Sequence, residues 1–286
     1  MTVNENCQKS RLASDVPPSC APPSGAAISL CGDRPKPGKI GGMHFLVFQH
    51  HESEHPGSLR AFWRRDGISW DTVALAQNEP IPASLVPYDA LVVMGGAMDV
   101  WQEDQFPWLV AEKAAIRHFV VELDRPFLGL CLGHQLLAAA LGGVVGPSPR
   151  PEVGITDVDL TGFGRDDPLF ATLPDPLQTF QWHGAEVSRL PAGAVLLAAN
   201  AVCGCQAFRW RRAYGLQFHA EITDDTVADW QAIPEYRAYL QSVLGPQGDR
   251  QLAQSTLAAL PSLQAIAARV HRNFMGLVDQ VLDSRG

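Results

Sequence analysis

The amino-acid sequence predicts an α/β protein with a doubly wound, mostly parallel (flavodoxin-like) sheet, an antiparallel extension and C-terminal helices. Three observations predict this fold. Short apolar runs alternate with helix-spaced segments up to residue 143, short strand candidates follow one another after residue 150, and helical periodicity returns from residue 223. Alternating strands and helices are typical of a parallel sheet covered on both faces, whereas consecutive strands favour antiparallel pairing.

The first half of the chain supplies the elements of the parallel sheet. Residues 45–48, 70–75 and 90–94 are predicted strands, and residues 59–65 and 108–122 are predicted helices. The second helix has its apolar residues at helical spacing: Leu109, Ala115, Ile116, Phe119 and Val120. Because strands and helices alternate here, we expect a doubly wound sheet.

A strand, a sharp turn and a helix follow around Cys131. An apolar run enters Gly129-Leu130-Cys131-Leu132-Gly133, and an Ala/Leu run then continues to two glycines. This is the cysteine version of the G-x-S-x-G nucleophile elbow, in which glycines let strand and helix approach closely. A thiol at a helix N-terminus is favoured as thiolate. A buried structural cysteine is the alternative interpretation, since free cysteines are often buried.

The second half of the chain predicts short strands and then helices. The strand candidates are residues 154–160, 179–182, 195–199, 206–209 and 215–218, read as an antiparallel extension. Thr223 is the expected helix cap, with Asp224 and Asp225 in the first turn. A last helix is predicted from Ser262, with one apolar face: Leu263, Ile266, Val270, Phe274, Leu277, Val278 and Val281. That face suits packing on the core or on a second protomer.

The domain organisation follows from these patterns. Residues 1–42 contain six prolines and five glycines without periodicity, so we expect a disordered or loosely packed leader. Residues 43–225 form the expected main domain, and residues 226–286 a helical extension packed on it or at an oligomer interface.

Composition narrows the function classes. The net charge of −8 over 286 residues argues against a general nucleic-acid surface, and the apolar stretches are too short for a membrane span. The first ten residues lack a signal-peptide core, and the six cysteines do not form a disulfide framework. We therefore expect a cytoplasmic protein without nucleic-acid or membrane partners.

Two segments are candidates for metal binding. The His-rich stretch at residues 50–55 follows a strand, where a solvated loop that borders the site is favoured over a metal cluster. Cys203 and Cys205 lack a second cysteine pair, which disfavours zinc. No metal or other cofactor is expected.

A cysteine nucleophile needs a base that takes its proton and a group that orients this base. The best candidates are His219 and Glu221, at the end of the last predicted strand. On a continuing strand the two side chains point the same way, whereas a bend after His219 lets Glu221 reach its far ring nitrogen. An ordinary polar residue at a strand end is the alternative for His219.

Backbone donors for an oxyanion are also predicted. Gly95 and Gly96 end a strand of the same sheet and can present a bare N–H, and Leu132, after the nucleophile, supplies a second. A plain turn between strand and helix is the alternative. A phosphate loop is weakly supported, because neither glycine-rich phosphate motif is present.

Together these elements resemble the class I (triad-type) glutamine amidotransferases, and most closely the stand-alone group similar to the glutaminase domain of GMP synthase. The resemblance covers residues 45–223. It is carried by residues 93–100, 106–109, 129–135, 181–184 and 215–221, including Cys-x-Gly-x-Gln and Gln-Phe-His-x-Glu.

The resemblance implies a catalytic role for each matched residue. Cys131 attacks the side-chain amide of glutamine and forms a γ-glutamyl thioester, while His219 acts as base and then acid and Glu221 orients it. The N–H groups of Gly96 and Leu132 form the oxyanion hole. No cofactor is implied.

The resemblance also implies substrate contacts. Gln135 holds the amino-acid end of the substrate, with backbone groups around His183 and Gly184. Two positions depart from the family pattern: Ala220 stands where proline is common, and Ala185 where aspartate is common. The second departure puts a substrate contact in doubt, but neither affects the triad.

The expected reaction releases glutamate and ammonia. The tail after Glu221 is too short and helical to be the ATP pyrophosphatase domain of GMP synthase, so a separate ammonia-accepting synthase subunit is one expectation. A free-standing hydrolase of γ-glutamyl amides or peptides is the alternative. A binding module without catalysis is disfavoured by the intact triad. Whether the chain forms a homo-oligomer stays open.

Overall fold

Residues 42–284 are described by the computed structural model, so the predicted leader lies almost wholly outside the described residues. The strands form one nine-stranded sheet in the order β2-β1-β3-β4-β9-β8-β7-β5-β6. Their bounds are β1 His44–Gln49, β2 Ser69–Ala74, β3 Ala90–Val93, β4 Phe127–Leu130, β5 Val144–Leu160, β6 Leu177–Arg189, β7 Val195–Ala199, β8 Ala207–Trp210 and β9 Ala213–Leu216.

The sheet has a parallel half and an antiparallel half. All pairings among β2, β1, β3, β4 and β9 are parallel, and those from β9 through β8, β7 and β5 to β6 are antiparallel. The predicted fold class is therefore confirmed. One assignment within it was wrong: the strand at residues 215–218 was grouped with the extension, but β9 pairs in parallel with β4.

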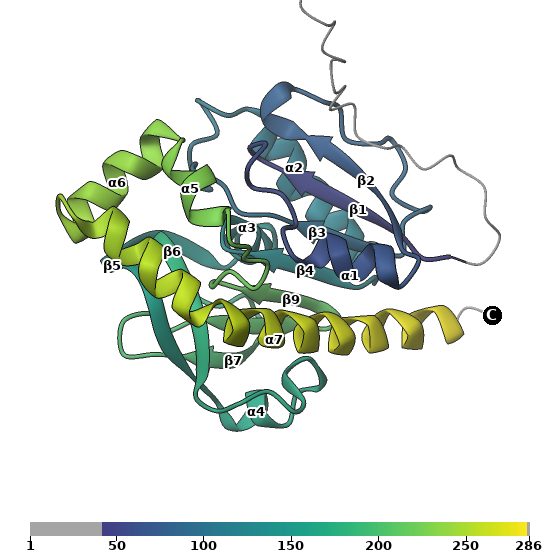
Figure 1. The fold of residues 1–286 in the computed structure, drawn as a ribbon. Coiled ribbons are helices and arrows are strands. Elements are labelled where there is room, and N and C mark those ends of the chain that lie inside the picture. Colours follow the sequence, from purple (N-terminus) through teal and green to yellow (C-terminus); the bar gives the residue numbers. More distant parts are fainter. Residues whose placement is uncertain (1–41, 285–286) are drawn as a thin grey trace, which may run out of the picture. The chain divides into compact units, whose positions relative to one another are not determined.

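Helices cover both faces of the parallel half (Figure 1). One face packs against α1 (Leu59–Arg65) and α7 (Gly248–Asp283), and the other against α2 (Trp108–Arg117) and α3 (Leu132–Ala140). In β1, Phe45 and Val47 face the first layer and Leu46 and Phe48 the second, and all four are fully buried. A continuous apolar run is what a strand buried on both faces requires.

The remaining elements are short or lie at the C-terminal end. They are the 3-10 turns Leu75–Gln77 and Pro168–Phe170, the π-helical turn His118–Glu122 after α2, α4 Gly162–Arg165, α5 Thr226–Gln231 and α6 Pro234–Leu244. The predicted helix at residues 108–122 is thus α-helical to Arg117 and π-helical beyond it.

Three further expectations need correction. The strands β5 and β6 run for 17 and 13 residues, longer than predicted, and pair antiparallel. The polar, proline-containing start of β5 and the polar end of β6 hide the pattern of a strand. The last helix begins at Gly248 rather than Ser262 and continues through Pro261. Thr223 does not cap α5: its backbone N–H donates to the Thr226 hydroxyl, and α5 starts after Asp225.

The C-terminal helices contact the rest of the fold. In α7, Ile266, Val270, Phe274 and Val278 belong to the cluster that includes Phe45 of β1. Residues of α5, α6 and the start of α7 form a smaller cluster with Phe180 and Trp182 of β6. The division into a domain at 43–225 and an extension stays a prediction.

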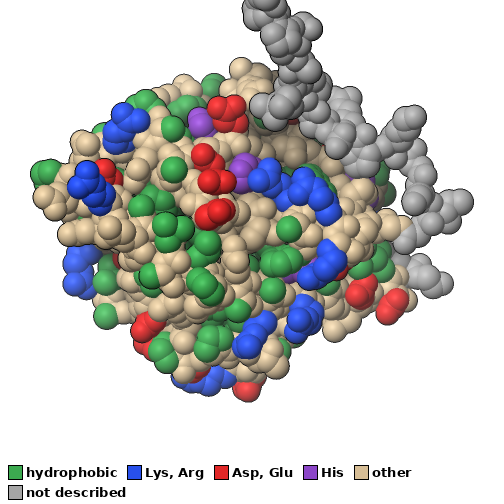
Figure 2. All heavy atoms as spheres, in the orientation of Figure 1, with side chains coloured by type: hydrophobic (Ala, Val, Ile, Leu, Met, Phe, Trp, Pro, Cys, Tyr) green, Lys and Arg blue, Asp and Glu red, His purple; other side chains and the backbone are tan. Residues whose placement is uncertain are grey.

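Charged side chains are mixed on the surface seen in Figure 2, where basic and acidic groups are interspersed. Within residues 42–284, no helix is both long enough and apolar enough to cross a bilayer.

Candidate active site

The turn at Cys131 is a strained link between β4 and α3. Cys131 has φ of 50°, in the left-handed region that non-glycine residues rarely adopt. A Cβ at Gly129 would lie 2.4 Å from the backbone of Gly133, and a Cβ at Gly133 would lie 2.2 Å from the Val93 oxygen. Strand and helix therefore approach as closely as the predicted elbow requires, and the thiol sits at the helix N-terminus.

The strand β9 brings His219 to this turn. Leu216 pairs with Leu130, and its carbonyl accepts a 2.8 Å hydrogen bond from the Cys131 N–H. After β9 the chain leaves the sheet register, and the His219 N–H donates to the Phe180 carbonyl of β6 at 2.9 Å. His219 thus stands at the end of the strand next to the elbow, which only the parallel placement of β9 achieves.

Glu221 reaches the ring of His219. The chain bends after His219, and His219 Nδ1 lies 2.8 Å from Glu221 Oε1, with both side chains almost fully buried. Burial by itself lowers the pKa of His219, but the charges of Glu221 and Cys131 and their hydrogen bonds raise it well above its usual value. Of the two arrangements considered from the sequence, the bend is the one observed.

The thiol has two further polar neighbours. Gln217 Nε2 and the Trp182 carbonyl each lie 3.7 Å from Cys131 Sγ. Gln217 was not singled out from the sequence, although it lies two residues before His219 in the same motif. Cys131 is 6% exposed, so the thiol is held in a nearly dry environment.

Gly96 and Leu132 have free backbone donors. Among residues 42–284, neither N–H donates a hydrogen bond. A Cβ at Gly96 would lie 2.7 Å from a methyl carbon of Leu132, so the Leu132 side chain packs against the Gly96 backbone. Two unpaired N–H groups near a nucleophile are what an oxyanion hole requires.

The side chains of Gln135 and His183 both contact residues of the protein interior. The Gln135 side-chain amide donates at 3.1 Å both to the Ala185 carbonyl and to Gln217 Oε1, inside the protein. His183 Nδ1 lies 3.1 Å from the Ala185 carbonyl and its Nε2 lies 3.3 Å from Glu152. Both side chains therefore contact the Ala185 carbonyl of β6. The substrate contacts expected of Gln135 and of the backbone around His183 and Gly184 stay a prediction.

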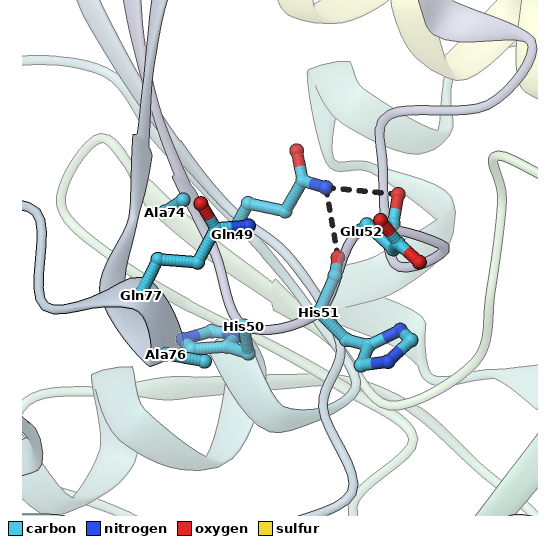
Figure 3. Close-up of a pocket in the computed structure, with 7 residues that line it drawn as sticks. All are labelled: Gln49, His50, His51, Glu52, Ala74, Ala76 and Gln77. Atoms are coloured by element: carbon cyan, nitrogen blue, oxygen red, sulfur yellow. Dashed lines mark hydrogen bonds between the residues drawn. The ribbon is translucent and has the colours of Figure 1, made fainter.

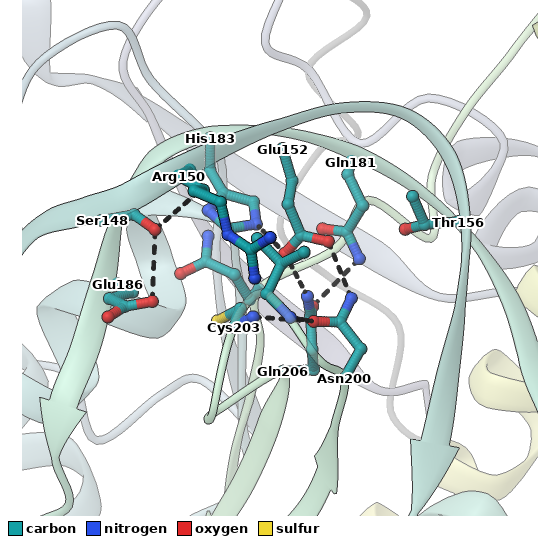
Figure 4. A network of polar contacts seen from close by, with 12 residues as sticks. Ser148, Arg150, Glu152, Thr156, Gln181, His183, Glu186, Asn200, Cys203 and Gln206 are labelled. Atoms are coloured by element: carbon teal, nitrogen blue, oxygen red, sulfur yellow. Dashed lines mark hydrogen bonds and ion pairs between the residues drawn. The ribbon is translucent and has the colours of Figure 1, made fainter.

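A polar network lies behind His183 (Figure 4). Glu152, His183 and Cys203 each offer one atom that could ligate a metal ion, and these three atoms lie within 4.8 Å of one another. The sequence did not suggest this grouping. Both oxygens of Glu152 already accept 2.7 Å hydrogen bonds, from the amides of Asn200 and Gln206. Because the carboxylate is satisfied in this way, the network acts as a support for β6.

Residues of the C-terminal helices border the site. Trp230 of α5 stacks edge-on against His219, with ring centroids 4.5 Å apart. Tyr236 of α6 donates a hydrogen bond to Glu54, and Gly184 faces the Tyr239 hydroxyl, which a Cβ would meet at 2.7 Å. Aromatic residues at helical spacing resemble any packed helix, so the sequence held no signal for these contacts.

The His-rich loop at residues 50–55 is only partly solvated. His51 and Glu52 are exposed and, with Gln49, Ala74 and Gln77, line a surface pocket of about 200 Å³ (Figure 3). In contrast, His50, which also borders this pocket, and Glu54 are each only 1% exposed. The expectation of a solvated loop was therefore wrong for these two residues, which turn inward to Glu112 and Tyr236 respectively.

The fold and the site define an α/β protein with a cysteine at a nucleophile elbow and a buried histidine–glutamate pair beside it. Residues 65–228 match the family model for class-I glutamine amidotransferases. The chain therefore belongs to the class-I glutamine amidotransferase family, whose members are amide hydrolases.

Known proteins similar to this chain include two curated relatives and a solved structure. It is 32% identical over 193 residues to the glutamine amidotransferase-like protein YfeJ of Salmonella typhimurium, covering 65% of this chain and 77% of YfeJ. It is also 32% identical over 181 residues to one subunit of the glutamine-hydrolyzing GMP synthase of Halobacterium salinarum, covering 63% and 89%. A glutamine amidotransferase structure from Thermotoga maritima superposes with a TM-score of 0.74 at 28% identity, covering 84% and 99%.

Proposed function

We propose that the chain hydrolyses the side-chain amide of glutamine through a γ-glutamyl thioester on Cys131. The observation that carries this proposal is the buried row of Cys131, His219 and Glu221, with the hydrogen bond between the last two at 2.8 Å. A cysteine, a base and an orienting carboxylate in this relation are the parts that nucleophilic acyl transfer needs.

In the first half-reaction, His219 holds the proton of the Cys131 thiol and the sulfur attacks the amide carbon. The carbonyl oxygen becomes an oxyanion that accepts hydrogen bonds from the N–H groups of Gly96 and Leu132. His219 then gives its proton to the nitrogen, the C–N bond breaks, and ammonia leaves the γ-glutamyl thioester behind.

In the second half-reaction, water attacks the thioester. His219 takes a proton from the water, the C–S bond breaks, and glutamate leaves with the thiol restored. Glu221 stabilises the imidazolium in both halves, and its charge supports the raised pKa of His219.

The destination of the ammonia is a separate question. One relative is named as a subunit of GMP synthase, which supports a separate ammonia-accepting synthase subunit for this chain as well. The polar first ten residues and a cysteine pattern that does not suggest a disulfide framework also support a cytoplasmic location.

A second candidate is hydrolysis of a γ-glutamyl amide or peptide without a partner. One observation favours it: α6 lies beyond the family match, and the charge of Cys131 is among the causes that raise the pKa of the Tyr236 and Tyr239 hydroxyls, after their burial. The two tyrosine hydroxyls are suited to contact a substituent on the amide nitrogen of a γ-glutamyl compound. The amide nitrogen of glutamine carries no such substituent.

The test is incubation of the purified chain with glutamine and with a panel of γ-glutamyl amides and peptides, followed by measurement of glutamate. A glutamine-like alkylating agent is added in parallel, and Cys131→Ala is the control. Glutamate release that Cys131→Ala abolishes supports the proposal. Labelling of Cys131 without turnover points to a missing partner. If the chain shows no turnover and Cys131 is not labelled, the proposed function is contradicted.

A further inference from the structure

The side chains of His50 and Glu112 form a buried pair that the mechanism above does not use. His50 follows β1, Glu112 lies in α2, and their side chains meet at 2.9 Å with no exposed surface. Burying two ionisable groups carries a large desolvation cost, which their attraction offsets only when the geometry is good. The pair therefore calls for a physical reason.

The second contact of His50 gives that reason. His50 Nδ1 lies 2.7 Å from the carbonyl oxygen of Gly95. Since a carbonyl only accepts, Nδ1 carries a proton, and Nε2 is left to face Glu112. Burial by itself lowers the pKa of His50, but the charge of Glu112, its hydrogen bond and the Gly95 carbonyl raise it above the usual value. When the ring is protonated, both nitrogens donate, Nδ1 to the Gly95 carbonyl and Nε2 to Glu112.

The Gly95 carbonyl belongs to the peptide unit that carries the Gly96 N–H. In a planar trans peptide the C=O and the N–H point in opposite directions, so the direction of one sets the direction of the other. Two successive glycines have no side chain to hold this unit against rotation. The hydrogen bond from His50 is the only one that the Gly95 carbonyl accepts among residues 42–284.

We infer that Glu112 and His50 position the oxyanion hole, by holding the Gly95–Gly96 peptide with its N–H turned toward the substrate oxygen. The inference rests on the proposed function, since it assigns a task within that reaction. Glu112 holds the His50 ring, His50 holds the carbonyl, and the bonded carbonyl also polarises the N–H on the same unit. Both are positioning residues, because neither touches the reacting atoms.

Packing around the pair is consistent with this task. The His50 ring stacks on Trp108 with centroids 5.5 Å apart, and a Cβ at Gly96 would lie 3.0 Å from His50 Cβ. The ring thus has little freedom, and a rigid ring transmits its position to the peptide. A purely structural pair would instead stabilise α2 on the sheet without affecting the chemistry.

The experiment compares two double variants that differ only at one donor. H50L/E112Q removes the donor to the Gly95 carbonyl, whereas H50N/E112Q keeps an N–H group in a side chain of similar size, and in both the buried carboxylate is neutralised. H271Q is the matched control, because His271 is also buried and also meets a carboxylate, Asp66 at 2.7 Å, but lies in α7.

Two reactions of Cys131 are measured for each variant. Hydrolysis of glutamine, or of the γ-glutamyl compound that the unsubstituted chain prefers, passes through an oxyanion. Alkylation by iodoacetamide displaces iodide at a saturated carbon and needs the thiolate but no oxyanion hole. Thermal unfolding is recorded in parallel.

We expect H50L/E112Q to lower kcat by about tenfold or more with little change in KM, since loss of one oxyanion donor costs about 10²–10³ in kcat. H50N/E112Q recovers part of the loss, and alkylation rates stay equal. If H50L/E112Q and the unsubstituted chain turn over equally, the inference is overturned while the proposed function stands. The same holds if the alkylation rate of H50L/E112Q falls as much as its turnover. An unsubstituted chain that hydrolyses no γ-glutamyl compound overturns the proposed function and the inference with it.

Discussion

The Tyr236 hydroxyl donates a hydrogen bond to Glu54 Oε1, across 182 residues of sequence. The other carboxylate oxygen of Glu54, Oε2, has no hydrogen-bond partner among residues 42–284. A Cβ at Gly95 would lie 2.6 Å from this oxygen and 3.0 Å from His219 Cε1, so the two side chains border the same space. Helix α6 therefore reaches the surroundings of His219 through one buried carboxyl group, although it lies beyond the segment that matches the family.

This contact predicts that Tyr236→Phe lowers the pKa of His219. Burial raises the pKa of Glu54, while the charge of His219 and the hydrogen bond from Tyr236 lower it. Without the hydroxyl, Glu54 holds a proton at higher pH and less negative charge supports the imidazolium, which then loses its proton at lower pH. The Cε1–H chemical shift of His219 across a pH titration measures this shift. Tyr239→Phe is the control, because the Tyr239 hydroxyl makes no hydrogen bond among residues 42–284.

Glu221→Gln should lower the pKa of His219 further, since the charge of Glu221 is the largest contribution that raises it. The imidazolium then persists over a narrower pH range, and the acidic limb of kcat/KM moves to lower pH. The rate at neutral pH should fall by about 10²–10⁴-fold, because a His219 ring that is no longer oriented loses the usual contribution of a positioned acid–base group. Glu235→Gln, on the exposed side of α6, is the matched control. A Glu221 variant with an unchanged pH profile would contradict the assigned role.

The elbow predicts that Gly133→Ala unfolds or inactivates the protein. An added Cβ would lie 2.2 Å from the Val93 carbonyl oxygen, so backbone has to move. Gly276→Ala is the matched control, because its Cβ meets nothing within 4 Å in helix α7 and alanine gains about 1 kcal/mol over glycine in a helix. The free energy of unfolding in urea and the rate of glutamate release are measured for both variants. A Gly133 variant as stable as the control would show that the strand and helix tolerate separation.

The long helix α7 should contribute strongly to stability. Phe274 is 2% exposed and packs edge-on against Phe45 of β1, with centroids 6.5 Å apart. Phe274→Ala is expected to lower the free energy of unfolding by about 3–5 kcal/mol, as for other buried aromatic truncations. Leu257→Ala, at a 55% exposed position of the same helix, should change it little. Denaturant unfolding measures both, and similar losses at the two sites would mean that α7 does not dock in solution as it does here.

Several features could be predicted because their signals are local. The elbow needs two glycines around Cys131 and a following apolar helix, and these residues are neighbours in sequence. The buried strands β1 and β3 are continuous apolar runs, and His219 and Glu221 are close enough that a single bend joins them. Each depends on the steric and hydrophobic properties of residues a few positions apart.

The tertiary structure alone decided which of these local elements meet. The sequence by itself determined the alternating strands and helices and the presence of a cysteine at the elbow with a histidine and a carboxylate two residues apart. Placing β9 in parallel beside β4, and turning His50 and Glu54 inward to Glu112 and Tyr236, depended on strand order and on helices distant in sequence. From sequence alone, a polar residue in a loop is predicted to be solvated unless its partner is known. The partner depends on the path of the whole chain and not on the residues next to it in sequence.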